Sequence, residues 1–430
     1  MPYHDVETTD RAALRDRQAD QLRETVDRAY ENVSRYRTRF DEAGIGPGDI
    51  DSIDDVERLP FTTKEDFQEE YPDGLFAVDW DDVARVHASS GTTGTPKIVP
   101  YTDGDLQVWR EVMARSLHAA GVRPDDTVQN AYGYGLFTGG MGFHDGTEAL
   151  GATVIPVGGG NTARQIDLLQ DLESDVLACT PSYCLYLAEQ AEERGVDLRE
   201  LPLSTVVIGA EPFTDPMREE IEAALDVTAI DVYGLSELIG PGVSIECEHA
   251  QAGLHVWEDH FYPEVVDPDT GEVLPEGEPG ELVLTNLTKV GLPAIRYRTG
   301  DITSLTREPC DCGRTHTRMD NVTGRTDDLL IVRGVNVYAS QIEAAMVDLE
   351  PVAPHYRIDL DREDALDRMR ITVEHHADYD GDPADLEDRV EQRLTEVLEV
   401  QPDAVEVVGP GGVERQETGK VTRVFDHRES

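Results

Sequence analysis

Apolar residues recur at helical spacing close to the start of the chain. Between positions 10 and 40 they stand three, four or eight residues apart among charged ones, at Leu14, Leu22, Val26, Tyr30, Val33 and Tyr36. Apolar positions at this spacing lie on one face of an α-helix. The pattern predicts an amphipathic helix over 10–40 that serves packing and carries no chemistry.

Short apolar runs alternate with helical patterns through the middle of the chain. Strand-like runs at 175–179, 205–208 and 228–233 are separated by stretches such as 216–225, whose apolar positions have helical spacing. Such alternation is typical of an α/β domain with a largely parallel sheet. Between 264 and 285 the pattern changes to short extended pieces broken by turn residues, which predicts the hairpins of a β subdomain.

The C-terminal part has the pattern of a separate α+β unit. A strand-like run covers 369–373, and a helix is predicted to begin near Pro383 and to bury one face, with Leu386, Val390, Leu394 and Val397. The predicted fold class is α/β. It combines a large N-terminal domain of parallel α/β sheets and a β subdomain over 1–326 with a small mobile α+β domain over 327–430.

The chain is strongly acidic along its whole length. Its 430 residues include 88 Asp and Glu but only 37 Lys and Arg, so the formal net charge is -51. This excess disfavours polyanionic partners such as nucleic acids. A disordered chain is the alternative interpretation, but the regular apolar segments disagree with it. Lysine occurs only at Lys64, Lys97, Lys289 and Lys420. Few lysines beside many carboxylates are typical of a folded protein adapted to molar salt, where screening weakens self-repulsion.

The start of the chain does not have the pattern of a secretion signal, and no membrane span is expected. The first ten residues are polar and acidic, and no later run approaches the roughly 20 apolar residues of a membrane span. The five cysteines are odd in number and come without a secretion signal, so disulfides are not expected. We expect a cytoplasmic protein, monomer or homodimer, with no membrane partner.

The sharpest chemical signal is a loop at residues 89–97, which reads SSGTTGTPK. Two glycines remove side-chain bulk, while hydroxyls, backbone N–H groups and Lys97 are left to surround an anion. The loop differs from a Walker loop, because Gly91 and Gly94 stand too close together and Pro96 precedes the lysine. It therefore predicts a phosphate site of another kind, with a plain Ser/Thr/Gly turn between two strands as the alternative.

This loop resembles the phosphate-binding loop of the adenylate-forming superfamily of acyl-CoA synthetases and luciferase-like enzymes. Four further segments match that superfamily in the expected order: DVYGLSE at 231–237, YRTGD at 297–301, GRTDD at 324–328 and TGK at 418–420. The whole chain resembles phenylacetate-CoA ligases, through LPFTTKEDF from Leu59, AYGYGLFTGG from Ala131, GAEP from Gly209 and IVRGVNVY from Ile331. Ala339 departs from those ligases, which usually carry proline there.

The resemblance implies an ATP-dependent enzyme that joins an aryl-acetate type acid, phenylacetate above all, to coenzyme A through an acyl-adenylate. AMP and pyrophosphate would be released, with Mg²⁺ as cofactor. Indoleacetate, hydroxyphenylacetate or benzoate are alternative acids. Two rival functions stay open: an adenylyltransferase that acts on a deazaflavin coenzyme, and a nucleotide-binding sensor without catalysis. Retention of Lys420 and Glu237 disfavours the sensor.

The resemblance implies three catalytic residues at the phosphates. Lys97 would act with the loop residues around the leaving pyrophosphate, which are Ser90, Gly91, Thr92, Thr93 and Gly94. Glu237 would help to hold Mg²⁺. Lys420 resembles the mobile lysine that bridges the acid and the α-phosphate during adenylation.

Other residues are implied to bind the nucleoside. Asp301 would accept hydrogen bonds from the ribose hydroxyls, and Arg325 would add a guanidinium donor. Tyr233 would lie near the adenine. Glu211 and Pro212 follow a strand end, where open α/β sheets bind ligands, and would line the adenine pocket.

The small domain is implied to turn between two half-reactions. Asp327 matches the hinge position of the family. After the turn, Gly334 and Val335, with Tyr338, would face coenzyme A.

An aromatic segment is the candidate acyl pocket. Tyr132, Tyr134 and Phe137 offer aromatic walls, and Gly209, the first residue of the GAEP segment, is a further candidate substrate-binding residue. Four glycines are expected to leave space for an aromatic ring, at Gly133, Gly135, Gly139 and Gly140. Ordinary aromatic core is the alternative.

Three cysteines and a histidine form a candidate structural zinc site. Cys310 and Cys312 make a Cys-x-Cys beside turn residues, and Cys247 lies in the preceding β region. Four Cys and His ligands suit tetrahedral zinc. His255 is preferred over His249 as the fourth ligand because it begins a strand-like stretch. Free buried thiols are the alternative.

Overall fold

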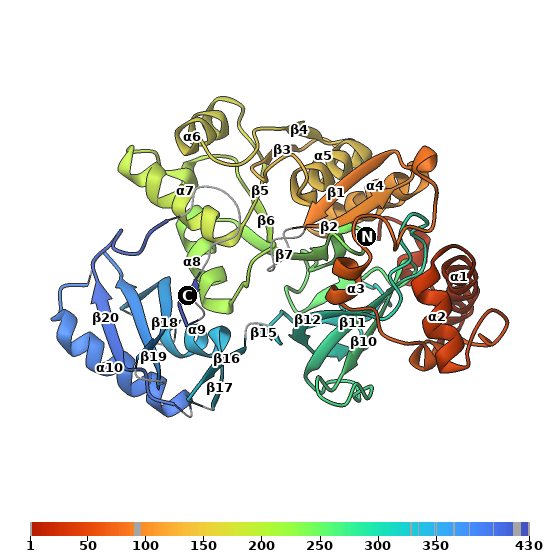
Figure 1. Ribbon diagram of the computed structural model, residues 1–430. Helices are drawn as coiled ribbons and strands as arrows, with labels where there is room; N and C mark the ends of the chain where they lie inside the picture. Colours follow the sequence, from red (N-terminus) through yellow and green to blue (C-terminus); the bar gives the residue numbers. More distant parts are fainter. Residues whose placement is uncertain are drawn as a thin grey trace.

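The computed structural model describes residues 2–89, 96–326, 329–333, 335–347, 349, 351–363, 366–377, 379–398, 400–415 and 423–428 (Figure 1). A large body contains most of the chain, and the C-terminal elements, drawn in blue, form a smaller body beside it. Within these ranges, every helix is too short or too polar to cross a membrane.

The chain begins with two helices where one was predicted. α1 covers Arg11–Asn32, with Asp10 as a side-chain cap that accepts hydrogen bonds from two N–H groups of the first turn, and α2 covers Ser34–Ala43. The prediction of one helix over 10–40 is wrong at Val33, whose backbone is extended (φ -116°, ψ 109°). Val33 is fully buried. The spacing of apolar residues continues across the break because both helices turn the same side towards the core.

Short elements lead from α2 to the phosphate loop and beyond. Between α2 and β1 they are η2 (Ile53–Arg58), α3 (Lys64–Glu69) and η3 (Trp80–Asp82). η1 (Asp5–Thr8) comes before α1, and η4 (Leu198–Glu200) lies later in the chain. β1 (Arg85–Ser89) and β2 (Lys97–Tyr101) form an antiparallel pair in which Ser89 lies opposite Lys97. The two ends of the phosphate loop are therefore side by side.

A nine-stranded sheet forms the centre of the large body, in the order β13-β14-β9-β8-β7-β6-β5-β3-β4. Its parallel strands are β3 (Thr127–Asn130), β4 (Thr153–Ile155), β5 (Val176–Cys179), β6 (Thr205–Gly209) and β7 (Thr228–Leu235). The accompanying helices are α4 (Asp103–Ala119), α5 (Thr138–Leu150), α6 (Thr162–Asp171), α7 (Pro181–Glu193) and α8 (Asp215–Leu225). The predicted α/β fold class is confirmed.

Antiparallel strands extend this sheet and build a second one. β8 (Gly240–Ile245), β9 (Leu254–Val256), β13 (Leu305–Thr306) and β14 (Arg318–Met319) continue the central sheet. A separate four-stranded sheet contains β10 (Phe261–Val266), β11 (Gly280–Asn286), β12 (Tyr297–Thr303) and β15 (Gly324–Arg325). The hairpin of β10 and β11 is the one predicted over 264–285.

The smaller body has its own hydrophobic core. Its elements are β16 (Leu329–Val332), β17 (Val335–Tyr338), α9 (Ala339–Val347), β18 (Val352–Glu363), β19 (Leu366–His375), α10 (Pro383–Val397), β20 (Ala404–Val408) and β21 (Val424–Asp426). Leu386, Val390 and Leu394 of α10 are buried as predicted, but Val397 is 38% exposed because the helix ends there. The boundary at 327 stays a prediction, since residues 327 and 328 lie outside the described ranges.

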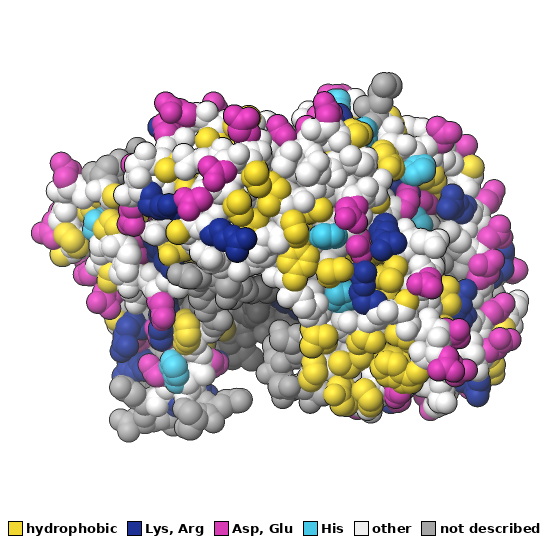
Figure 2. All heavy atoms as spheres, turned by 90° about the horizontal axis from the view of Figure 1, so that it is seen from above, with side chains coloured by type: hydrophobic (Ala, Val, Ile, Leu, Met, Phe, Trp, Pro, Cys, Tyr) yellow, Lys and Arg dark blue, Asp and Glu magenta, His cyan; other side chains and the backbone are white. Residues whose placement is uncertain are grey.

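The acidic residues lie mainly on the outside of this architecture. Figure 2 shows one face, over which Asp and Glu side chains are spread and interspersed with Lys, Arg and His. The interior of the large body is filled by apolar clusters around the central sheet. The strong negative charge is therefore carried mainly at the surface.

Candidate active site

Glu237 lies in the turn after β7 and meets both ends of the phosphate loop. Its Oε1 atom accepts hydrogen bonds from Lys97 Nζ, from Tyr297 Oη at 3.3 Å and from Ser89 Oγ at 3.4 Å. Burial raises the pKa of the Glu237 carboxyl, but the Lys97 ammonium and these bonds lower it more, so the net pKa shift is downwards. The carboxylate keeps its charge in the interior. Sequence reasoning missed Tyr297, although the YRTGD motif contains it.

Asp301 and Arg325 face each other from the neighbouring strands β12 and β15. Asp301 accepts hydrogen bonds from Arg325 Nη1 and, at 2.5 Å, from Tyr233 Oη. Arg325 also donates to the carbonyl of Thr299 at 3.0 Å. The structure thus brings together three of the residues predicted to bind the nucleoside. A carboxylate offers about four lone-pair sites, which is the chemistry needed to accept hydrogen bonds from a diol.

The carboxyl end of β6 carries the GAEP segment. A Cβ atom at Gly209 would lie 2.1 Å from the carbonyl oxygen of Val232, so only glycine allows β6 and β7 to approach this closely. Glu211 accepts hydrogen bonds from Ser182 N at 3.2 Å and Oγ at 2.6 Å, which place its carboxylate at the N-terminus of α7. Pro212 is exposed beside it. These residues lie where open α/β sheets bind ligands.

The predicted acyl segment divides between core and surface. Tyr132 is buried, stacks on Phe143 with ring centroids 4.8 Å apart, and donates a 2.5 Å hydrogen bond to the carbonyl of Cys179. It therefore braces the end of β5. Tyr134 and Phe137 are 37% and 40% exposed. These two rings, unlike Tyr132, are accessible to a substrate.

The glycines around this segment serve two purposes. A Cβ at Gly133 or Gly135 would meet no atom within 4 Å. At Gly139 it would lie 2.6 Å from the Phe137 ring, and at Gly140 it would lie 2.5 Å from the carbonyl oxygen of Gly133. The expectation that all four leave space is wrong for Gly139 and Gly140, which let α5 pack closely against the loop.

Several predicted residues lie outside the described part of the chain: Ser90, Gly91, Thr92, Thr93, Gly94, Asp327, Gly334 and Lys420. Val335 and Tyr338 lie in β17, with only their backbone described. Their roles stay predictions.

Three cysteines and His255 converge at the far edge of the central sheet. Their ligand atoms all lie within 4.8 Å of one another, with Cys247 Sγ 3.7 Å from Cys310 Sγ and Cys312 Sγ 3.4 Å from His255 Nε2. A tetrahedral site with Zn–S near 2.3 Å and Zn–N near 2.0 Å requires separations of about 3.8 Å and 3.5 Å. His249 instead is exposed and lies beside Glu248. The donor set and its spacing fit zinc.

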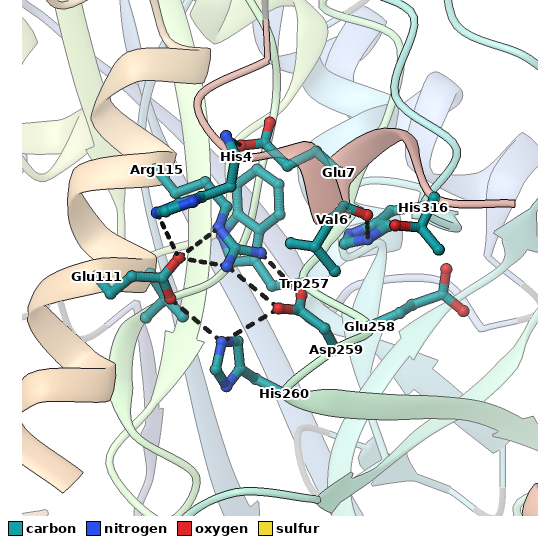
Figure 3. A network of polar contacts seen from close by, with 12 residues as sticks. His4, Val6, Glu7, Glu111, Arg115, Trp257, Glu258, Asp259, His260 and His316 are labelled. Carbon is teal, nitrogen blue, oxygen red and sulfur yellow. Dashed lines mark hydrogen bonds and ion pairs between the residues drawn. The ribbon is translucent and has the colours of Figure 1, made fainter. Parts of the chain in front are cut away.

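A network of charged side chains ties the N-terminal segment to α4 (Figure 3). Arg115 donates to Asp259 Oδ1 at 2.7 Å and to Glu111. His260 Nε2 lies 3.2 Å from Glu111 and 3.3 Å from Asp259. A cavity of about 660 Å³ lies between these side chains and residues 3–6. Because the carboxylates are paired within the protein, we assign the network to packing.

Two family models match the two bodies of the molecule. Residues 47–287 match the AMP-binding enzymes, and residues 334–428 match the AMP-binding enzyme C-terminal domain. The fold and the site around Glu237 and Asp301 therefore define an AMP-binding enzyme. The chain is 49% identical to the phenylacetate-coenzyme A ligase of Thermus thermophilus, over 100% of both chains. It is 46% identical to that of Escherichia coli, over 98% of this chain and 97% of that protein. The chain belongs to the phenylacetate-coenzyme A ligase family.

Solved structures of one ligase resemble the molecule to different degrees. 2-Hydroxyisobutyryl-CoA ligase in the postadenylation state, with R3-HIB-AMP, is 29% identical and has a TM-score of 0.91, over 100% of this chain and 94% of that chain. In the thioesterification state, with 2-HIB-AMP and CoA, the TM-score is 0.73, over 98% and 91%. As a whole, the chain is therefore more similar to the postadenylation state of that ligase than to its thioesterification state.

Proposed function

We propose that the protein is an ATP-dependent phenylacetate-coenzyme A ligase. The observation that carries this proposal is 44–49% identity, along nearly the whole chain, to three phenylacetate-coenzyme A ligases. An oxygen of the acid attacks the α-phosphorus of ATP and the bond to pyrophosphate breaks. The thiol sulfur of coenzyme A then attacks the acyl carbon, loses its proton, and AMP leaves. A deazaflavin adenylyltransferase is not favoured, because these relatives are CoA ligases.

The geometry supports a division of roles within the large domain. Lys97, held by Glu237, is the cation at the end of the phosphate loop that balances charge on the leaving pyrophosphate. Glu237 fits Mg²⁺, since a buried ionised carboxylate is the oxygen ligand that this ion prefers, and the bound ion would offset phosphate charge. Asp301 would hold the ribose diol, with Tyr233 and Arg325 keeping its carboxylate in place.

The phosphate-loop residues 90–94, Glu211 and Pro212 would complete the nucleotide site, and Tyr134 and Phe137 would meet the aryl group. In the small domain, Lys420 would bridge the acid and the α-phosphate. We propose that this domain, residues 327–430, turns about Asp327 to bring Gly334 and Val335 to coenzyme A. Such a turn is supported by 2-hydroxyisobutyryl-CoA ligase, which has been solved in a postadenylation and a thioesterification state that resemble this chain to different degrees.

The cluster of Cys247, His255, Cys310 and Cys312 is proposed to hold one structural zinc ion. Elemental analysis of protein purified without added metal should find one zinc per chain. Changing Cys312 to Ser should remove it and lower the melting temperature, because the loop at 310–316 loses its crosslink. A zinc content near zero in stable, active wild-type protein would contradict the site.

A pyrophosphate-release screen tests the main proposal. Phenylacetate, other aryl acids and alkyl acids are compared in concentrated KCl, with and without coenzyme A. The expected result is pyrophosphate release that depends on phenylacetate, with a thioester product when coenzyme A is present. Acid-dependent pyrophosphate release that never yields a thioester would overturn the choice of acceptor.

A further inference from the structure

The turn that presents Glu237 is held through its backbone carbonyls. Tyr101 Oη shares its single hydrogen between the carbonyl of Ser236 at 3.3 Å and that of Ile239 at 3.0 Å. One buried hydroxyl thus contacts backbone carbonyls before and after Glu237 in the chain. The Tyr101 ring stacks on Trp109, with centroids 5.1 Å apart. Any shift of this ring would move the carboxylate.

Lys289 approaches the same turn from the segment after β11. The backbone N–H of Lys289 donates to Asn286 Oδ1 at 2.8 Å, and Asn286 Nδ2 donates to the carbonyl of Leu238 at 3.0 Å. The Lys289 ammonium lies over the face of Tyr101, with Nζ 4.0 Å from the ring centroid. Lys289 therefore adjoins both side chains that hold the carbonyls of the turn.

The environment of Lys289 is unfavourable for a residue kept only for packing. Its side chain is fully buried, and Nζ has no hydrogen-bond acceptor in the described part of the chain. Burying an ammonium without an acceptor costs stability, and a methionine would fill similar space without that cost. A sequence with only four lysines has nonetheless retained one here. A contribution to stability does not explain this lysine.

The charge on Lys289 has a use at this position. A desolvated cation is attracted to the face of an aromatic ring, and more strongly than at an exposed site. Burial lowers the pKa of Lys289 to about 7, while the carboxylates of Asp105 and Glu237 oppose that shift. The ammonium form is thus substantially populated at neutral pH.

We propose that Lys289 is a positioning residue for adenylation, whose ammonium holds the Tyr101 ring and through it the turn that presents Glu237. This inference rests on the proposed ligase function. Lys289 touches no reacting atom, so its effect should be confined to the half-reaction that uses Glu237.

Lys289→Met separates positioning from packing. A positioning role predicts a loss confined to adenylation without a loss of stability, whereas a packing role predicts lower stability and equal losses in both half-reactions. As a positioning residue, its loss should slow acid-dependent pyrophosphate exchange about 10- to 100-fold, since small displacements of a catalytic group have effects of this size. The Mg²⁺ concentration for half-maximal exchange should rise. The melting temperature should stay equal or increase, and thioester formation from synthetic phenylacetyl-adenylate should be kept. Lys64→Met, on α3, is the matched control and should match wild type in both half-reactions.

A double-mutant cycle with Tyr101→Phe tests whether Lys289 acts through that ring. Tyr101→Phe keeps the ring but removes the hydroxyl that holds the two carbonyls, so it should slow pyrophosphate exchange by itself. Adding Lys289→Met should then cause little further loss, because residues that act on one contact are not additive. Independent, multiplying losses would contradict the proposal.

The outcomes distinguish this inference from the proposed function. Wild-type protein without acid-dependent pyrophosphate exchange would refute the ligase proposal itself. Active wild type with an equally active Lys289→Met variant would overturn only the role of Lys289. A Lys289→Met variant with a lowered melting temperature and equal losses in both half-reactions would mark the lysine as structural.

Discussion

The turn at Glu237 and the contact between the two domains are held in different ways. The turn is fixed by neutral hydrogen bonds from buried side chains, Tyr101 and Asn286, to three of its carbonyls. The domain contact includes ion pairs to one partly exposed carboxylate. Among the residues that the structure describes, the ion pairs between the large and the small domain both include Glu189 of α7.

Glu189 is a loose partner in this contact. Its side chain is 45% exposed, and it lies 3.2 Å from His355 Nε2 and 3.2 Å from Arg415 Nη2. Arg415 is held more firmly within the small domain by the buried Glu374, with contacts of 2.7 Å and 2.9 Å. Arg415 can therefore leave Glu189 without being left unpaired.

The difference matches the work of each region. The Glu237 carboxylate, which is proposed to act at ATP, is held in place by the core, so that no reorganisation is needed during the reaction. The small domain, which is proposed to change position, is attached by ion pairs to one partly exposed carboxylate, and pairs at a surface are worth roughly 0–1 kcal/mol each. Changes at the turn should therefore be large and specific for adenylation. Changes at the domain contact should be small.

The largest expected effect concerns stability at the turn. The pKa of Lys289 is about 7 in the folded protein against 10.5 as its ordinary value. The folded protein thus binds this proton more weakly than the unfolded chain, and the free energy of unfolding should rise between pH 7 and 10.5. The difference of 3.5 units corresponds to roughly 4 to 5 kcal/mol.

Denaturant unfolding of wild type and Lys289→Met at pH 7 and pH 9.5 in concentrated KCl measures this effect. The stability advantage of Lys289→Met should be largest at pH 7 and shrink at pH 9.5. The difference in free energy of unfolding between the two proteins could instead be the same at both pH values. Lys289 would then not lose its charge in the folded state, and its position beside the turn would not lower stability.

Lys420→Ala tests the mobile side of the comparison. It should slow pyrophosphate exchange about 10²- to 10³-fold, because one charged donor to the transition state is lost. Thioester formation from synthetic acyl-adenylate should be largely kept, since Lys420 is expected to have left the site by then. Equal losses in both half-reactions would instead make this lysine structural.

Glu189→Gln should have the smallest effect, about two- to fivefold. It removes the charge that both interdomain pairs share, so the small domain should occupy its position beside α7 less often. Pyrophosphate exchange should fall, while thioester formation from acyl-adenylate stays equal or rises. Glu192→Gln changes an exposed carboxylate on the same helix and should leave both unchanged. If Glu189→Gln slowed pyrophosphate exchange as much as Lys420→Ala, the contact between the two domains would have to be strong.

Patterns along the chain predicted much of this protein. Alternating apolar runs predicted the strands found as β5, β6 and β7, because a buried parallel strand needs an apolar run whatever its neighbours are. Ligand chemistry pointed to Cys247, His255, Cys310 and Cys312, which the structure brings together. Periodicity failed at Val33, because spacing reports which face is buried and not whether the backbone stays helical.

The sequence by itself determined which chemical groups are available for the proposed nucleotide site: a loop ending in Lys97 and the carboxylates Glu237 and Asp301. It also determined the excess of acidic residues and the scarcity of lysine. These follow from residue identity and local order. Only the tertiary structure decided that Lys289 lies against Tyr101 and that Glu189 meets the small domain. No motif marks these residues, because burial and charge pairing depend on which distant strands and helices pack together.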